Sequence, residues 1–142
     1  MITNVSLTTI YCLDQQATRD FYVDVLGFQP HTDITMGEGF RWLTVALPDH
    51  PELEVVLMKV GPPLDAEATA FVERQLGKGQ MGGLGLRVDD CMKTAEELKA
   101  KGVSFVQEPS DRPYGVEAVI RDNSGNWLVL VESKPYSEAS FS

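Results

Sequence analysis

Residues 14–28 read DQQATRDFYVDVLGF. The apolar side chains of Ala17, Phe21 and Val25 recur at helical spacing, which predicts a helix over residues 15–26. Gly27 ends this helix, because glycine readily adopts the left-handed conformation that closes a helix. A β-rich run, VSLTTIY, precedes the segment, so the chain begins with a strand and a helix.

The same order of elements recurs later in the chain. A second strand-like run leads into a helical segment that ends at Gly102, and a hairpin follows each helix. Gly27 and Gly102 lie 75 positions apart, whereas Gly39 and Gly115, at the start of the two hairpins, lie 76 apart. The sequence therefore predicts a duplicated unit.

We predict an α+β fold of two tandem βαβββ modules, about residues 1–60 and 81–133. A linker helix over about residues 65–77 joins them, since an apolar stripe follows a capping Asp65 there. Residues 134–142 are polar and are interpreted as a tail. The 142 residues fit a single domain made of the two modules.

Charge and composition exclude several classes of function. The formal net charge of −9 disfavours nucleic acid as a partner, because a polyanion is repelled. The sequence has no apolar run that would span a membrane and no signal-peptide pattern at Met1, so we expect a cytoplasmic protein without membrane contact. Cys12 and Cys91 are predicted to be reduced and packed.

Two segments resemble a known family. Residues 21–28, FYVDVLGF, resemble the FY-x-D-x-LGF segment of the glyoxalase/bleomycin-resistance/extradiol-dioxygenase proteins, the vicinal oxygen chelate superfamily. Residues 121–126, RDNSGN, resemble their RDP-x-GN turn, and the likeness covers about residues 2–132. The resemblance implies a curled eight-stranded cup, in which two modules enclose a cavity, and a homodimer.

The resemblance also implies positions for a metal, which catalytic members hold in the cup. It places these ligands at Asn4, Glu54, Gly83 and Val129, and only Glu54 has a side chain that commonly binds a cation. We therefore expect no metal and no other cofactor. His31 and His50 are interpreted as solvated surface residues.

Four further residues are candidates for contact with a small molecule. Arg41 and Glu117 occupy matching places at an offset of 76, and each charge alternates with apolar neighbours along a strand. Trp42 and Tyr114 add flat surfaces on which a planar ligand would stack. The alternatives are that the two charges lie on a rim or pair with each other, and that Trp42 packs in the core.

Two functions follow from the resemblance and the candidate residues. The first is a metal-free protein of the drug-binding or resistance type that binds a small planar or aromatic molecule through Arg41, Trp42, Glu54, Tyr114 and Glu117. The alternative is a metal-dependent lyase, isomerase or dioxygenase of the same superfamily. The absence of metal-binding side chains at Asn4, Gly83 and Val129 favours the metal-free binding protein.

Overall fold

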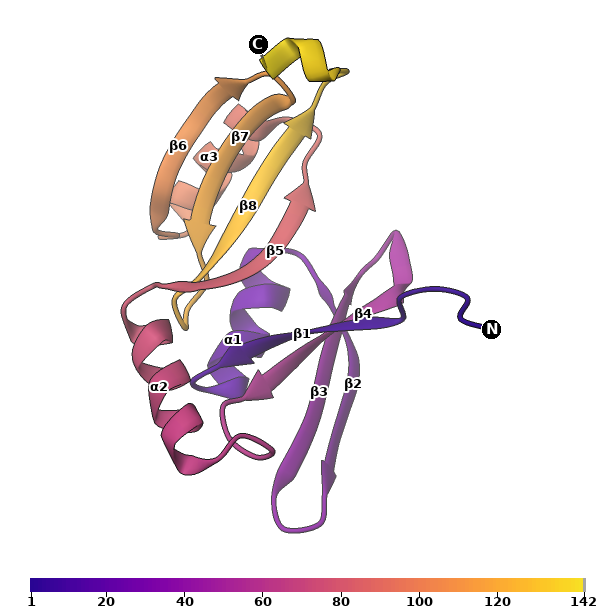
Figure 1. Ribbon diagram of the computed structural model, residues 1–142, viewed down its shortest axis with the longest axis vertical. Helices are drawn as coiled ribbons and strands as arrows, with labels where there is room; N and C mark the ends of the chain where they lie inside the picture. The colour runs from indigo at the N-terminus through magenta and orange to yellow at the C-terminus, as the bar shows by residue number, and fades with distance from the viewer. Residues whose placement is uncertain (142) are drawn as a thin grey trace. The chain divides into compact units, whose positions relative to one another are not determined.

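The computed structural model describes residues 1–141 and contains two compact units, Met1–Gly77 and the residues from Lys78 onward. Each unit holds one four-stranded sheet and its own helices (Figure 1). The predicted class, α+β with two tandem modules, is confirmed. The eight strands form two separate sheets and no closed barrel.

The first unit follows the predicted order of elements. Its bounds are β1 (Leu7–Cys12), α1 (Gln15–Asp20) continued by the π-helical turn η1 (Phe21–Val25), β2 (Gln29–Met36), β3 (Phe40–Leu47), β4 (His50–Lys59) and α2 (Ala66–Gly77). The strand order is β1-β4-β3-β2, with β1 parallel to β4 and the other pairs antiparallel. His50, interpreted from the sequence as a solvated surface residue, is the first residue of β4, and its side chain is 71% exposed.

Local signals explain the helices of this unit. The Asp14 carboxylate accepts a hydrogen bond from the backbone N–H of Ala17, which caps α1. Gly27 has φ of +84°, as its position after the helix requires. Asp65 caps α2 through the N–H of Ala68. The helix predicted over residues 15–26 is therefore present, with its last turn wound as a π-helix.

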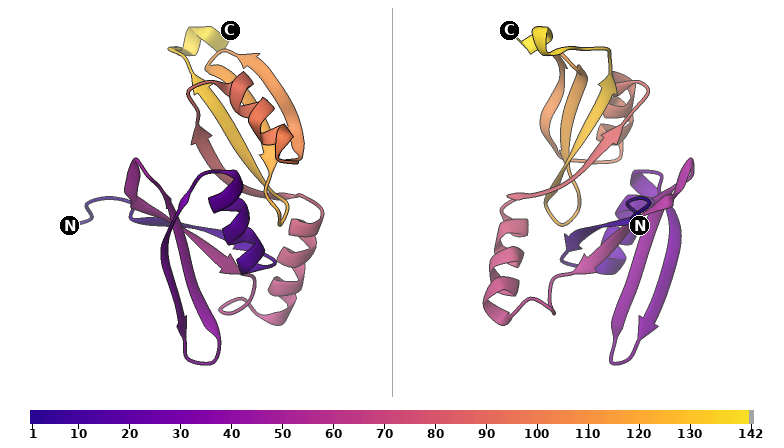
Figure 2. Two further views of the ribbon diagram at one scale, coloured as in Figure 1. Left: turned by 180° about the vertical axis from the view of Figure 1, so that it is seen from behind. Right: turned by 45° about the vertical axis from the view of Figure 1, so that its right-hand side comes forward.

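The second unit repeats this arrangement (Figure 2). Its bounds are β5 (Met81–Arg87), α3 (Cys91–Ala100), β6 (Phe105–Arg112), β7 (Gly115–Arg121), β8 (Asn126–Ser133) and the short 3-10 helix η2 (Glu138–Phe141). The order β5-β8-β7-β6 matches that of the first sheet, and the outer pair β5 and β8 is again parallel.

One side of each sheet forms the core. Leu43, Val45 and Val55 are buried in the first unit. Ala118 and Ile120 are buried in the second unit, where α3 contacts β6, β7 and β8. Because strand side chains alternate between faces, the residues between these core positions point to the opposite side. We call that side the open face of each sheet.

The C-terminal residues are not a free tail. Tyr136 and Phe141 surround Tyr114, with Phe141 stacked on it at 6.3 Å between ring centroids and Tyr136 edge-on at 6.5 Å. Tyr136 and Phe141 are the two aromatic residues of the segment 134–141, and their contacts with Tyr114 hold this segment against the second unit. Residue 142, the end of the predicted tail, lies outside the described residues.

Two smaller expectations concern the cysteines and the membrane. Cys12 and Cys91 are both buried, as predicted, and neither belongs to a disulfide among the described residues. Among the described residues, no helix has the length and apolar character needed to cross a membrane.

Candidate functional site

The open face of the first sheet is identified by strand pairing. Leu7 lies directly opposite Glu54, and Thr44 lies opposite Val56. Directly opposed residues of paired strands share a face. Trp42 stands two residues from Thr44 on β3 and therefore joins them on the same side.

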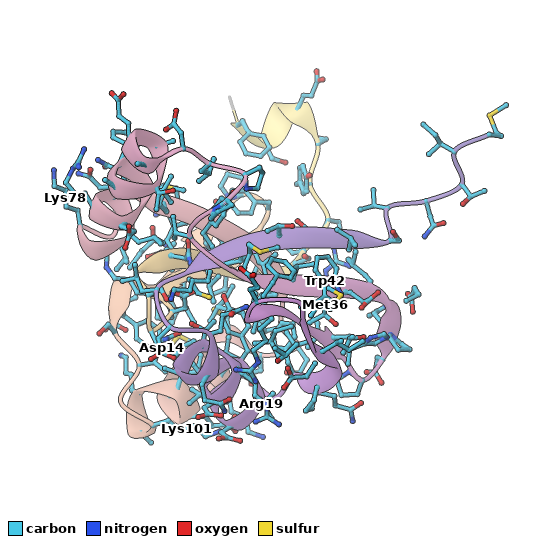
Figure 3. All side chains as sticks on the ribbon, turned by 90° about the horizontal axis from the view of Figure 1, so that it is seen from below. Asp14, Arg19, Met36, Trp42, Lys78 and Lys101 are labelled. Atoms are coloured by element: carbon cyan, nitrogen blue, oxygen red, sulfur yellow. The ribbon has the colours of Figure 1, made fainter. Side chains whose placement is uncertain are left out.

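This face is apolar and partly exposed. Relative exposures are 40% for Leu7, 51% for Ile34, 46% for Met36 and 44% for Phe40. Figure 3 labels Trp42 and Met36, which belong to the neighbouring strands β3 and β2. Ile34, Met36 and Phe40 are neighbours on β2 and β3, and exposed apolar groups of this kind are typical of surfaces that contact a ligand or another protein.

Glu54 is the charged group on this apolar surface. Its Oε1 atom lies 2.9 Å from the Thr44 hydroxyl and 3.0 Å from Nδ1 of His31. Thr44 is completely buried, whereas the Glu54 side chain keeps 26% of its exposure. The register of β2 shifts between Pro30 and Thr32, so His31 lies in a β-bulge. A bulge redirects a side chain, which explains how His31 contacts Glu54 on β4.

His31 is therefore more than a solvated surface residue. Its side chain is 39% exposed, yet it is fixed against a carboxylate from another strand. Sequence reasoning assigned no role to His31 or Thr44. The signal that could have found His31 is the proline before it, since Pro30 marks a place where strand pairing is interrupted.

Arg41 lies on the opposite side of β3 from Trp42. Its guanidinium donates two hydrogen bonds of 2.8 Å to the Asp33 carboxylate and one of 3.0 Å to Oε1 of Gln16 on α1. The hydrogen bond from Arg41 is the main cause that lowers the pKa of Asp33, and the same bond raises the pKa of Arg41. The structure thus joins Arg41 to the helix side and does not bring it together with Trp42.

Arg41 still borders a hollow at the ends of the strands. A space of about 370 Å³ lies next to Arg41, Gln15, Phe40 and Met58. Gln15 donates hydrogen bonds to the backbone carbonyl groups of Arg41 and Leu57, which fixes the start of α1 against the sheet. We interpret Arg41 as a structural residue that connects β3 to β2 and to the start of α1.

The matching of Arg41 with Glu117 at an offset of 76 is wrong. Glu117 pairs with Val131 and lies on the open face of the second sheet, one residue before buried Ala118. The buried face of β3 matches the buried face of β7 only when the two modules are aligned at an odd offset. The 75 positions between Gly27 and Gly102 are such an offset. Trp42, and not Arg41, then corresponds to Glu117, because a shift of one residue exchanges the two faces of a strand.

The open face of the second sheet contains a hollow of about 250 Å³. Its lining combines apolar and charged side chains, namely Val106, Glu117, Val119, Arg121, Trp127 and Val129, together with Gly79. Arg121 donates a hydrogen bond of 2.7 Å to the Gly79 carbonyl oxygen, which fixes the guanidinium at one end. Trp127 remains 39% exposed, so its ring surface is accessible.

Tyr114 and Glu117 form a second fixed polar group. The Tyr114 hydroxyl donates a hydrogen bond of 2.6 Å to Oε2 of Glu117, and Gln107 and Arg112 contact the same carboxylate at 3.4 and 3.7 Å. The hydrogen bond to Glu117, with a further contribution from burial, raises the pKa of Tyr114. The structure therefore joins two predicted residues, and Gln107 and Arg112 are members that the sequence did not reveal.

The metal expected of catalytic relatives does not fit the donor atoms. Asn4 precedes β1, and the β1 residue opposite Glu54 is Leu7, which cannot bind a cation. Within the described chain, no three His, Cys, Asp or Glu side chains are close enough to hold an ion. Glu54 and His31 alone supply one carboxylate and one imidazole, fewer than a protein zinc site uses.

Comparison with known proteins agrees with this architecture. The family model for the glyoxalase/bleomycin resistance protein/dioxygenase superfamily matches residues 4–130. The crystal structure of UcmS2 is 48% identical, with a TM-score of 0.87, over 94% of this chain and 100% of that one. The chain is also similar to TnmS3, an antibiotic binding protein from Streptomyces sp. CB03234, with 29% identity and a TM-score of 0.74 over 94% of this chain and 98% of the other.

A curated relative extends the likeness to another organism. The uncharacterized protein YurT of Bacillus subtilis (strain 168) is 30% identical over 128 residues, which covers 90% of this chain and 98% of that protein. With the duplicated βαβββ units and the match over residues 4–130, the chain belongs to the glyoxalase/bleomycin resistance protein/dioxygenase superfamily.

Proposed function

We propose that this protein binds a small planar or aromatic molecule without a metal, on the open faces of its sheets. Trp42 and Glu54 are the proposed contacts on the first sheet. Glu117, oriented by Tyr114, is the proposed contact on the second. Arg41 is left out, because its guanidinium is held on the helix side by Asp33 and Gln16.

One observation carries the proposal. Each open face presents apolar side chains together with a few polar groups that are already fixed by neighbours, such as Glu54 held by Thr44 and Glu117 held by Tyr114. Binding sites for small molecules have this composition, since apolar area supplies affinity and a few placed polar groups supply orientation. The similar protein TnmS3 is an antibiotic binding protein, which supports a small molecule as the ligand.

Native mass spectrometry of freshly purified protein tests the proposal directly, because a carried molecule adds its mass. Calorimetric titration with planar aromatic antibiotics then measures affinity. We expect Trp42→Ala or Trp127→Ala to weaken binding by roughly 1–3 kcal/mol, through loss of ring contact. Met92→Ala is the control, since Met92 is an exposed apolar residue on α3, the helix on the core side of the second sheet. Equal affinity in all four proteins would contradict the proposal.

We also propose that the protein forms a homodimer. Exposed Phe71 on α2 supplies apolar surface of the kind that subunit contacts cover. Sedimentation velocity at tens of micromolar should give about twice the mass of one chain. A single species with the mass of one chain would contradict this assembly.

A further inference from the structure

We propose that Glu54 selects ligands that carry a hydrogen-bond donor: the molecule on the open face of the first sheet donates an O–H or N–H group to Oε2 of Glu54. This inference rests on the proposed function and names a ligand class for it. The residues that carry it are Glu54, Thr44, Thr32 and His31.

The direction of the hydrogen bonds can be derived from Thr32. Its backbone N–H can only donate, and it lies 3.1 Å from the Thr44 hydroxyl oxygen. That hydroxyl therefore accepts from Thr32 and uses its single proton toward Oε1 of Glu54, 2.9 Å away. Glu54 is thus fixed as an acceptor by the backbone of β2.

His31 occupies the same oxygen of Glu54. Its Nδ1 atom lies 3.0 Å from Oε1 and also 3.0 Å from the hydroxyl oxygen of Thr32. Oε1 therefore accepts the Thr44 hydrogen bond and lies within ion-pair distance of His31, whereas Oε2 accepts no hydrogen bond from the described residues.

The surroundings make the unused oxygen selective. Leu7 lies opposite Glu54 on β1, and the face continues with Val56 and Trp42. An aromatic molecule that covers this face removes water from Oε2. A carboxylate oxygen that loses water without gaining a donor is strongly unfavourable, so a molecule that lacks a donor is rejected.

The ligand class follows from this chemistry. It is a flat aromatic molecule with a hydroxyl or amino group at one edge, the ring lying on the apolar side chains and the donor reaching Glu54. A site that needs a donor discriminates between ligands more strongly than apolar contact alone does. The reason is that a ligand without a donor leaves the Glu54 carboxylate unpaired.

Glu54→Gln is the decisive variant because it replaces the acceptor atom Oε2 by an amide nitrogen, which donates hydrogen bonds. The Thr44 hydroxyl donates, so it holds the amide oxygen of Gln at the Oε1 position. The amide nitrogen then replaces Oε2 and presents donors to the ligand, while size and shape are preserved. Glu73→Gln is the matched control, since it makes the same charge change at an exposed position on α2.

Equilibrium dialysis with 2-naphthol, 2-methoxynaphthalene and naphthalene tests the proposal. The three share a ring system, and only 2-naphthol has a donor. We expect the wild-type protein and Glu73→Gln to bind 2-naphthol about tenfold more tightly than either other probe, and Glu54→Gln to bind the three within about twofold.

The outcomes separate this inference from the proposed function. Equal binding of the three probes by the wild-type protein, or a preference that survives in Glu54→Gln, overturns the role of Glu54 and leaves aromatic binding intact. Absence of binding by all three probes counts against the proposed function and overturns the inference with it. The wild-type preference is informative by itself, so the test does not depend on how well the variant folds.

Discussion

Thr44 shows how one buried hydroxyl connects the site to the strand beside it. Thr44→Val keeps the branched shape but leaves the Thr32 N–H and Oε1 of Glu54 each without one hydrogen-bond partner. We expect the free energy of unfolding to fall by about 1–3 kcal/mol, measured by urea denaturation. The control is Thr9→Val, at an exposed position of β1, which should change stability by less than about 0.5 kcal/mol. Equal effects of the two changes would show that the hydroxyl has no structural role.

Tyr114 predicts a dependence of stability on alkaline pH. Its pKa is raised above 10.0 by the hydrogen bond to Glu117, so the neutral phenol stabilises the folded state below pH 10. That contribution is lost as the pH rises through the raised value. The stability advantage of the wild-type protein over Tyr114→Phe should therefore shrink between about pH 8 and about pH 11 in urea denaturation.

Phe141→Leu is the control for this titration. Phe141 also contacts the Tyr114 ring, but its side chain has no group that gains or loses a proton. The stability difference between this variant and the wild-type protein should stay constant over the same pH range. A constant difference for Tyr114→Phe as well would refute the contribution of the Glu117 hydrogen bond.

Among the structural elements, the turn between β7 and β8 depends most on one carboxylate. Oδ1 of Asp122 accepts hydrogen bonds from the backbone N–H groups of Ser124, Gly125 and Asn126, and Oδ2 accepts one from the Asn126 side chain. This network explains why the RDNSGN segment has its sequence. Asp122→Ala should lower the free energy of unfolding by about 3 kcal/mol or more.

Asp49 provides the comparison for Asp122. It lies exposed in the turn between β3 and β4, and its substitution by Ala should change stability by less than about 0.5 kcal/mol. Thermal unfolding of both variants, followed by circular dichroism, measures the difference. Similar melting temperatures would show that the turn forms without its buried carboxylate.

For the whole molecule, the donor atoms predict independence from divalent metal. Glu54 and His31 are the only residues of that cluster that could bind an ion, so purified protein should contain no stoichiometric Ni, Zn, Fe or Mn. Addition of a chelator should leave the melting temperature unchanged, because removal of a ligand that is not bound cannot destabilise the fold. A fall of several degrees would contradict this expectation.

The sequence by itself determined the elements and the family. Caps at Asp14 and Asp65, the closing Gly27 and the RDNSGN turn act through neighbouring residues, so their effects can be predicted without tertiary contacts. The duplicated order of strands and helices followed from the same local signals. The carboxylate Glu54 was also recognised as a candidate from its place on the fourth strand.

Only the tertiary structure decided which side chains share a face. Arg41 and Trp42 are adjacent in sequence but point to opposite sides of β3, and a one-residue error in matching the modules assigned Arg41 the wrong side. The contact between His31 and Glu54 depends on a bulge in β2, and the packing of Phe141 on Tyr114 depends on the chain folding back. Register, bulges and long-range packing are set by interactions between distant segments, which local periodicity does not encode.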